Sequence, residues 1–219
     1  MFVTLDLFSA LVDSRAGAAP VLADLAPEAV DGALLYDEWD TRSKATQRDR
    51  TDWVPFAEHC RAALAATWST HGWPTDDSVA LTDRLLASLP DWPLWPDVAD
   101  ALPRLSATHR VGVLSNVDDD LLARTRVAPL VAEADRLTSQ RLRAYKPAPA
   151  LYRRAVGAGV DVHVPASARD TRGALEAGLL VVRVARPGHR VDPAGPRPAH
   201  VVTDLHDLPA VLESLDVEA

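Results

Sequence analysis

The first apolar segment of the chain lies almost at its N-terminus and predicts a buried strand. Residues 2–8 are β-branched, aromatic or Leu, with a single acidic residue, Asp6, among them. A short apolar run of this kind is typical of a strand that is covered on both faces. Burying a carboxylate in such a segment is costly unless positive charge or hydrogen bonds meet it. Asp6 is therefore either a functional group at a strand end or a cap for the turn that follows.

The pattern changes after this strand, because residues 16–90 carry apolar side chains at helical spacing and show no strand-like alternation. The apolar positions that mark four helices in this block are Val21, Leu22 and Leu25, then Leu34, Leu35 and Trp39, then the run 53–70, and then Leu81, Leu85 and Leu86. Proline residues between 91 and 96 predict a stiff return from the block. An all-helical block that interrupts an α/β pattern indicates an inserted domain.

From residue 97 onward, strand-like and helix-like segments alternate. Short apolar runs predict strands at 110–116, 137–138, 162–164, 180–184 and 201–202, with helices between them. Three acidic residues, 118–120, open one of these helices, where they would stabilise its N-terminus.

Strands that alternate with helices indicate a mostly parallel sheet covered on both faces. The predicted fold class is therefore α/β: a Rossmann-like, doubly wound parallel sheet core with an inserted all-helical cap domain. The expected core domain comprises residues 1–14 and 91–219, and the expected helical cap domain comprises residues 15–90.

Composition narrows the class of protein. The 219 residues are 47% hydrophobic and carry a formal net charge of −8, which supports a sizeable core and argues against nucleic-acid or membrane partners. The single cysteine, Cys60, excludes an internal disulfide and fits a reducing cytoplasm. We find no signal peptide and no apolar run of about 18 residues, so we expect a cytoplasmic protein.

Polar residues gather where the predicted strands end. Asp6, the pair Ser115–Asn116 and the turn 167–170 each follow a strand, and the loop bearing Lys146 is expected nearby. In a parallel α/β sheet, ligands bind beyond the carboxyl ends of the strands. This edge of the sheet is therefore the expected functional site.

Four short segments at this edge occur in a known order. They are Asp-Leu-Phe at 6–8, Leu-Ser-Asn at 114–116, Tyr-Lys-Pro at 145–147 and Ser-Ala-Arg-Asp at 167–170. Together, with a helical insert between the first and the second, they resemble the haloacid dehalogenase (HAD) superfamily of aspartate-nucleophile hydrolases with a subclass I cap. The resemblance covers the core segments and the position of the cap.

The resemblance implies roles for individual residues. Asp6 would be the nucleophile that forms and then releases a covalent ester, and Lys146 would supply the positive charge beside it. Asp170 would position the hydrolytic water or Lys146. The substrate-binding residues implied by the resemblance or by position are Phe8, Ser9, Arg42, Ser115, Asn116 and Ser167.

Each of these residues also has a plainer interpretation. Lys146 could be an ordinary solvated loop lysine, although the chain contains only one other lysine, Lys44. The Ser115–Asn116 pair could be a turn and a helix cap, and Asp170 could be the N-cap of the helix that follows it.

Departures from the phosphatase pattern favour one branch of the superfamily. Phosphatases of this kind carry a second Asp two residues after the nucleophile and another just before the fourth segment, where this chain has Phe8 and Ala166. A divalent metal needs several oxygen ligands. The chain therefore looks like the 2-haloacid dehalogenase branch, for which no metal or other cofactor is expected. Mg²⁺ would be needed only by the phosphatase alternative.

The match to that branch is incomplete in two places. The branch uses a cap arginine after a tryptophan to receive the halide, whereas Trp39 is followed by Asp40. Arg42 or Arg48 is the hypothesised replacement. Further cations in or near the cap are Arg15, Lys44 and Arg50. In addition, Ser9 and Ala10 stand where the branch has Gly-Thr, so a threonine that supports the nucleophile is missing.

The sequence thus predicts a hydrolase that cleaves carbon–halogen bonds in a small anionic organic substrate through an aspartyl ester. Two alternatives stay open: a Mg-dependent small-molecule phosphatase with a degenerate metal site, and a non-catalytic binding protein of the same fold. A homodimer is compatible with the sequence. His163 and His206 have no partner at metal-ligand spacing, so structural roles are expected for them.

Overall fold

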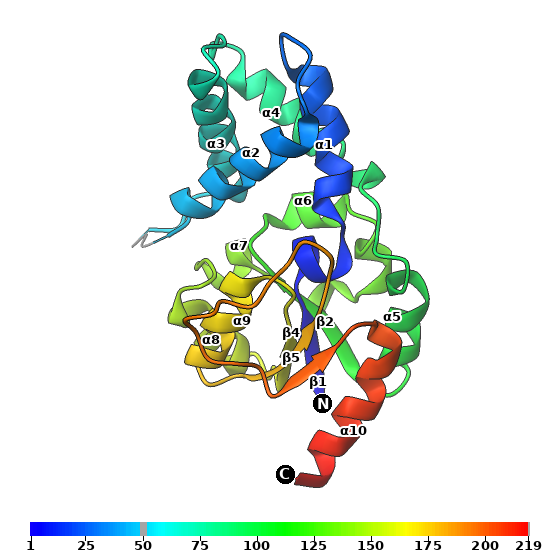
Figure 1. The fold of residues 1–219 in the computed structure, drawn as a ribbon. Coiled ribbons are helices and arrows are strands. Elements are labelled where there is room, and N and C mark those ends of the chain that lie inside the picture. The colour runs from blue at the N-terminus through cyan, green and yellow to red at the C-terminus, as the bar shows by residue number, and fades with distance from the viewer. Residues whose placement is uncertain (49–51, 219) are drawn as a thin grey trace.

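The structure, a computed structural model, describes residues 1–48 and 52–218 and consists of two parts (Figure 1). One part is a sheet with helices around it, and it contains the N-terminus and the C-terminal helix. The other is a group of four helices that stands beyond one end of the sheet.

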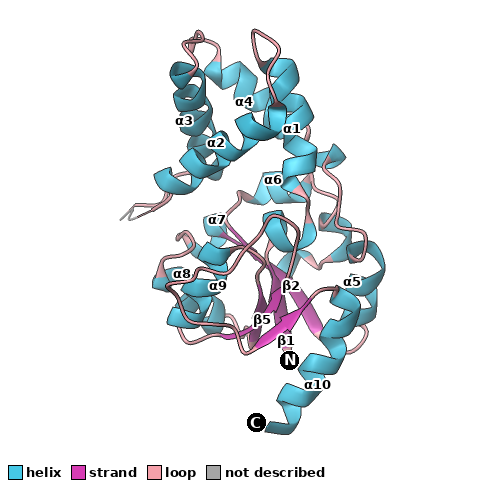
Figure 2. Ribbon diagram, in the orientation of Figure 1, coloured by secondary structure: helices cyan, strands magenta, loops and turns pink. Residues whose placement is uncertain are grey.

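The sheet contains six parallel strands in the order β3-β2-β1-β4-β5-β6 (Figure 2). The strands are β1 (Phe2–Leu5), β2 (Arg110–Ser115), β3 (Arg136–Thr138), β4 (Val162–Val164), β5 (Leu180–Val184) and β6 (His200–Val202). The first strand is central, and Leu5 is in register with Val113 on one side and Val164 on the other. The sheet reverses its winding direction at β1, which is where α/β sheets bind ligands. The predicted α/β class is confirmed.

Helices cover both faces of the sheet. In Figure 1, α8 (Pro149–Gly157) and α9 (Ala168–Glu176) lie on one side, and α5 (Val98–Ser106) and α10 (Leu208–Glu218) lie on the other. Phe2 packs in one buried cluster with Tyr152 of α8, whereas Val3 and Leu5 belong to a second cluster that includes Leu208 of α10. Neighbouring side chains of a strand point to opposite faces, so β1 contributes to both cores.

The group of four helices occupies the position predicted for the insert. Its members are α1 (Ser14–Leu25), α2 (Gly32–Thr46), α3 (Phe56–Thr70) and α4 (Ser78–Ala87), each packed on the next. Helix α3 begins three residues later than predicted, because Pro55 disfavours helical backbone in the residue before it. Buried Leu22, Leu35, Leu64 and Trp68 form part of the core of this group.

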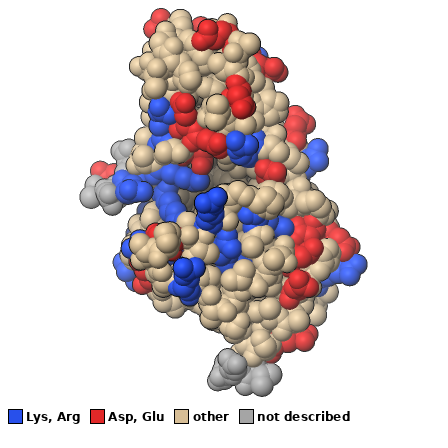
Figure 3. Space-filling view, viewed as in Figure 1, with Lys and Arg blue, Asp and Glu red and all other residues tan. Residues whose placement is uncertain are grey.

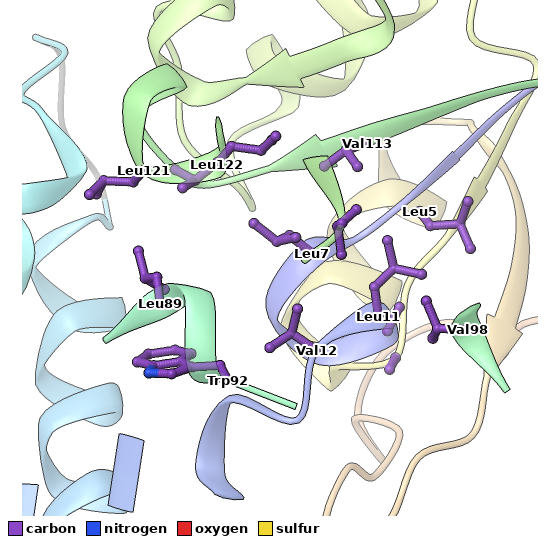
Figure 4. Packing of buried hydrophobic residues seen from close by; sticks show 14 of the residues in the cluster. Leu5, Leu7, Leu11, Val12, Leu89, Trp92, Val98, Val113, Leu121 and Leu122 are labelled. Carbon is purple, nitrogen blue, oxygen red and sulfur yellow. The ribbon is translucent and has the colours of Figure 1, made fainter. Parts of the chain in front are cut away.

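The remaining elements are short, and of these the sequence predicts the helix that opens at residues 118–120. They are a π-helical turn at Leu7–Leu11, the helices α6 (Asp119–Ala123) and α7 (Ser139–Leu142), and single 3₁₀ turns at Leu89–Asp91, Ala128–Leu130, Glu133–Asp135 and Leu205–Asp207. The turn at Leu89–Asp91 lies on the return from the four helices to the sheet, and it places Trp92 near Val12 (Figure 4).

Asp119 and Asp120 lie in the first turn of α6, as expected, whereas Asp118 has a different role. The Asp118 side chain makes no capping bond to α6, the helix that it precedes. Its two oxygens instead accept hydrogen bonds from Phe56 N at 2.8 Å and Ala57 N at 3.0 Å, at the start of α3. The N-cap residue of α3, Pro55, has no side-chain acceptor to offer. A residue of the sheet part therefore caps a helix of the inserted part.

Candidate active site

Asp6 ends β1 and caps the π-helical turn at Leu7–Leu11. Its Oδ2 accepts hydrogen bonds from Ser9 N at 3.1 Å and Ser9 Oγ at 2.6 Å. The turn is held by its own apolar side chains, because Leu7 and Leu11 are fully buried near Leu5 (Figure 4). The carboxylate is therefore fixed at the edge of the sheet by the same residues that build the core.

Lys146 reaches this carboxylate from the loop between α7 and α8. Its Nζ donates to Asp6 Oδ1 at 3.0 Å and to Asp170 Oδ2 at 2.5 Å. Ser115 Oγ, at the end of β2, donates to the same Asp6 oxygen at 3.2 Å. Lys146 is only 4% exposed, so the ion pairs form where water screens them little. One ammonium thus holds two carboxylates that are far apart in the sequence.

Asp170 has partners on both of its carboxylate oxygens. Besides Lys146, it accepts a hydrogen bond from Tyr152 Oη at 2.9 Å, and His163 Nε2 lies 3.0 Å from its Oδ2. Burial alone would raise the pKa of Asp170, but Lys146 and His163 together hold it well below its usual range. The other ring nitrogen of His163, Nδ1, lies 3.0 Å from Thr4 Oγ1 and 3.2 Å from Thr4 O, so both ring nitrogens have partners.

Asn116 organises the loop that carries Lys146. Its Oδ1 accepts from Lys146 N at 2.7 Å, and its Nδ2 donates to Lys146 O at 3.1 Å. The same Nδ2 donates to Gln47 Oε1 at 2.8 Å, next to α2. The Asn116 amide is thus engaged with protein groups on both sides, and it links the catalytic loop to the helical part.

A cleft lies between the helical part and the sheet part, and Asp6, Lys146 and Asp170 all line it. The empty space within it is about 710 Å³, open solvent included. Figure 3 shows Lys and Arg side chains gathered along the hollow between the two parts. The apolar and aromatic residues that line the cleft are Phe8, Tyr36, Trp39, Phe56, Leu86, Leu89 and Trp92.

Four of the expected binding residues line the cleft. Phe8 lines the cleft and stacks on Phe56, with ring centroids 5.7 Å apart. Ser115 and Asn116 also line it. Ser167 lines it as well, and its Oγ accepts from Asp170 N at 3.4 Å, so it caps α9.

The other two expected binding residues, Ser9 and Arg42, do not line the cleft. Ser9 contacts Asp6 but does not line the cleft. Arg42 does not line it either, because it donates to Glu38 at 3.2 Å and to Thr70 at 3.0 Å. Arg48 is exposed beside a different hollow. The structure therefore places neither hypothesised replacement for the missing cap arginine against the cleft.

The remaining cations considered from the sequence differ in their position relative to the cleft. Lys44 lines the cleft, but its Nζ is paired with Asp40 Oδ2 at 2.5 Å. Arg15 forms an exposed pair with Asp37 at 2.9 Å outside the cleft. Arg50 lies outside the described residues.

The residues at this edge of the sheet fit a divalent metal poorly. Among the described residues, no group of three or more His, Cys, Asp or Glu side chains could hold a metal ion. The Lys146 ammonium lies between Asp6 and Asp170, where it already balances their charge. Ala166, just before the fourth segment, offers no ligand.

Sequence reasoning did not assign site roles to four residues that the structure brings here. Tyr152 and His163 contact Asp170, Gln47 contacts Asn116, and Arg169 lines the cleft. His163 was assigned a structural role only. Arg169 had a usable signal, because it directly precedes Asp170 in the fourth segment.

Solved structures with the same architecture include L-2-haloacid dehalogenases. The one from Xanthobacter autotrophicus has a TM-score of 0.84 at 24% identity, with 98% of each chain covered. A defluorinating L-2-haloacid dehalogenase has a TM-score of 0.80 at 27% identity, covering 97% of this chain and 94% of that one. A 2-haloacid dehalogenase from Pseudomonas syringae pv. Tomato DC3000 has a TM-score of 0.64 at 26% identity, with 98% of each chain covered.

No family model and no curated protein sequence matches the chain. Within the described residues, none of the helices is both long enough and apolar enough to cross a bilayer.

Proposed function

Because the chain shares its fold with the L-2-haloacid dehalogenases, we propose that it is a hydrolase of the haloacid dehalogenase superfamily that releases halide from small 2-haloacids. The observation that carries the proposal is the position of Asp6. Its carboxylate lines the cleft and is held by Lys146, Ser9 and Ser115.

The reaction would proceed in two displacements. An Asp6 oxygen attacks C2 of the haloacid, the new carbon–oxygen bond forms, and the halide leaves with the bonding electron pair. Water then attacks the carbonyl carbon of the ester, which restores the Asp6 carboxylate and releases a 2-hydroxy acid and a proton. The ester intermediate divides one difficult displacement into two easier ones.

The neighbours of Asp6 would have distinct roles. Lys146 donates a hydrogen bond to the Asp6 carboxylate and stabilises negative charge on the ester carbonyl as water attacks. Asp170 is a weak base, since its pKa is lowered, so we assign it the role of holding Lys146 in place rather than accepting a proton.

We also propose that residues 15–90 act as a cap over a catalytic core formed by residues 1–14 and 91–219. The hydrogen bond between Gln47 and Asn116 supports this division, because it joins the two parts beside the cleft. A reducing, cytoplasmic setting is supported by the free, buried thiol of Cys60. The proposed reaction needs no second subunit; a homodimer would be detected by light scattering in solution.

The phosphatase alternative finds less support. An alkoxide leaving group needs a proton donor, and the residue at that position, Phe8, is packed between Phe56 and Trp92. A halide leaving group needs neither a proton nor a metal. Turnover of small phosphate esters that stops on addition of a chelator would favour the phosphatase.

A single-turnover reaction in H₂¹⁸O tests the proposal. Enzyme in excess over 2-chloropropionate should release chloride and incorporate ¹⁸O into Asp6, because water attacks the Asp6 carbonyl carbon. Mass spectrometry of the peptide that contains Asp6 reads the label. The variant Asp6→Asn should release no halide, whereas Asp76→Asn, a change at an exposed residue of the helical part, should match the native protein.

Two results would contradict the proposal. Label that appears in the product during the first turnover would mean that water attacks the substrate directly. Equal rates for native protein and Asp6→Asn would remove Asp6 as the nucleophile. An absence of turnover across a broad panel of haloacids would favour the non-catalytic alternative.

A further inference from the structure

One arginine of the cleft has no carboxylate partner. Arg169 lies at the start of α9, and its guanidinium donates from Nη1 to Lys44 O at 3.0 Å and from Nη2 to Lys146 O. Its Nε is buried and forms no hydrogen bond. A guanidinium has more N–H groups than these two bonds use, so Arg169 keeps donor capacity.

The charges along the cleft are otherwise matched. Among the described residues that line it, the cations are Lys44, Lys146 and Arg169. Lys44 is paired with Asp40, and Lys146 is paired with both catalytic carboxylates. Arg169 contacts only main-chain carbonyl oxygens. It is therefore the lining cation that an incoming anion can neutralise without displacing a carboxylate.

The surroundings of Arg169 make such an anion favourable. Burial lowers the pKa of Arg169 because the charged form has lost part of its hydration. A buried charge without a counter-ion is costly, and an unpartnered buried N–H adds to that cost. A carboxylate offsets both, since its two oxygens match the planar fork of a guanidinium.

We propose that Arg169 binds the carboxylate of the substrate. It would do so from the catalytic core, next to Asp170 in the sequence and in contact with the loop that carries Lys146. Arg169 and Asp6 line the same cleft, so a carboxylate bound by Arg169 would lie in the cleft that Asp6 faces. The identity of the bound acid as a haloacid rests on the proposed function. The binding of a carboxylate by Arg169 does not depend on it.

Arg169 also contacts both parts of the molecule. One of its hydrogen bonds goes to Lys44 in α2 of the helical part, and the other goes to Lys146 in the core. An anion held by Arg169 therefore lies where the two parts meet.

The test compares a carboxylate with its neutral amide. Propionate and propionamide are titrated by NMR into native protein and into Arg169→Met and Arg169→Lys. We expect Arg169→Met to weaken propionate binding about tenfold to a hundredfold, the size of a charge-assisted hydrogen-bonded contact. Propionamide binding should stay unchanged. Propionate binding by Arg169→Lys should be weaker than in native protein and stronger than in Arg169→Met, because lysine keeps the charge but lacks the planar guanidinium.

A matched control lies in the same helix. Arg172 is paired with Glu176 at 2.7 Å and with Asp192 at 2.9 Å, and it does not line the cleft. Arg172→Met removes one positive charge from α9 and should bind both probes as the native protein does. Equal losses of propionate binding in Arg172→Met and Arg169→Met would mean that overall charge controls binding, which would overturn the proposal.

Further outcomes are decisive. Unchanged propionate binding by Arg169→Met would overturn the proposal, and so would equal weakening of both probes, which indicates a structural role. Steady-state halide release separates this inference from the function. If native protein binds propionate through Arg169 but releases no halide, the function fails and this inference stands. If Arg169→Met turns over 2-chloropropionate with an unchanged KM, the proposed function stands and this inference fails.

Discussion

Asp170 is the residue with the strongest electrostatic coupling in the site. It is buried, and its oxygens contact Lys146, His163 and Tyr152. The charges around it hold its pKa below the ordinary value, so the folded protein releases this proton more readily than the unfolded chain does. Its ionisation therefore stabilises the fold above about pH 4, and that contribution is lost as the pH falls toward the folded-state pKa.

The variant Asp170→Asn tests this coupling. At pH 7 we expect it to lower the free energy of unfolding by about 3–5 kcal/mol, because Lys146 loses a buried partner. Urea unfolding at pH 7, 5, 4 and 3 should show the difference from native protein shrinking below about pH 4. The exposed control Asp76→Asn should follow the native curve throughout. A difference that stays constant with pH would mean that Asp170 does not titrate as described.

The core of the site could be predicted at this scale because its members lie in short segments at strand ends. Asp6, Lys146 and Asp170 are each recognisable from their neighbours in the sequence. The contacts of His163 and Arg169 could not be predicted, because they depend on which side chains meet once β1 and β4 pair and α2 lies over the cleft.

At the scale of elements, α9 closely approaches the loop that carries Lys146. A Cβ at Gly173 would lie 2.8 Å from Pro147 Cβ and 2.8 Å from Tyr152 Oη. Only a glycine lets α9 come so near, and the nearness sets the position of both Lys146 and Asp170. The spacing of these elements is therefore part of the site.

The variant Gly173→Ala should disturb stability and activity together. Overpacking at this contact should cost about 1–3 kcal/mol in the free energy of unfolding, and halide release should slow because Pro147 is pushed and Lys146 with it. Gly157→Ala, in α8, is the matched control, since a Cβ there meets open space. It should be neutral or stabilise by up to about 1 kcal/mol. An unaltered rate for Gly173→Ala would show that Lys146 tolerates movement of the loop.

The cap that Asp118 provides for α3 gives a second prediction for elements. Asp118→Ala removes the acceptors for Phe56 N and Ala57 N and should cost about 0.5–2 kcal/mol. Asp118→Asn keeps one acceptor, and because burial raises the pKa of Asp118, it also relieves a desolvated charge. Thermal unfolding should therefore rank Asn above Ala. Equal destabilisation by Asn and Ala would mean that the negative charge, and not the retained acceptor, holds the helix.

Most strands and helices could be predicted, because the spacing of apolar residues within each segment indicates its secondary structure. The role of Asp118 could not, since its partners Phe56 and Ala57 are about sixty residues away in the chain. The π-helical turn after β1 also has no local signature, because it follows from the burial of Leu7 and Leu11 in a core built by later segments.

At the scale of the molecule, charged and apolar side chains line the same cleft. Asp6, Lys146 and Asp170 are the charged group. The apolar group, here called the apolar wall, includes Phe56 and Trp92 from the helical part and the return from it. The wall could not be predicted from the sequence, because the aromatic residues of the insert do not show which of them face the core. It implies that the substrate carries an apolar group beside its carboxylate.

A series of 2-chloro acids of increasing chain length tests the wall. Each buried methylene is worth about 0.8 kcal/mol, so kcat/KM should rise about fourfold per added carbon from chloroacetate until the cleft is filled. The matching unhalogenated acids, used as competitive inhibitors, should tighten by the same factor. A kcat/KM that is level or falls along the series would show that the apolar wall does not receive the substrate.

The central position of β1 has a consequence for the order of folding. Both of its neighbours in the sheet are distant along the chain, since β2 begins at Arg110 and β4 ends at Val164. The four helices pack on partners close by in the chain, so their contacts close shorter loops than the pairing of β1 does. We therefore expect the contact between Asp6 and Lys146 to form late in folding.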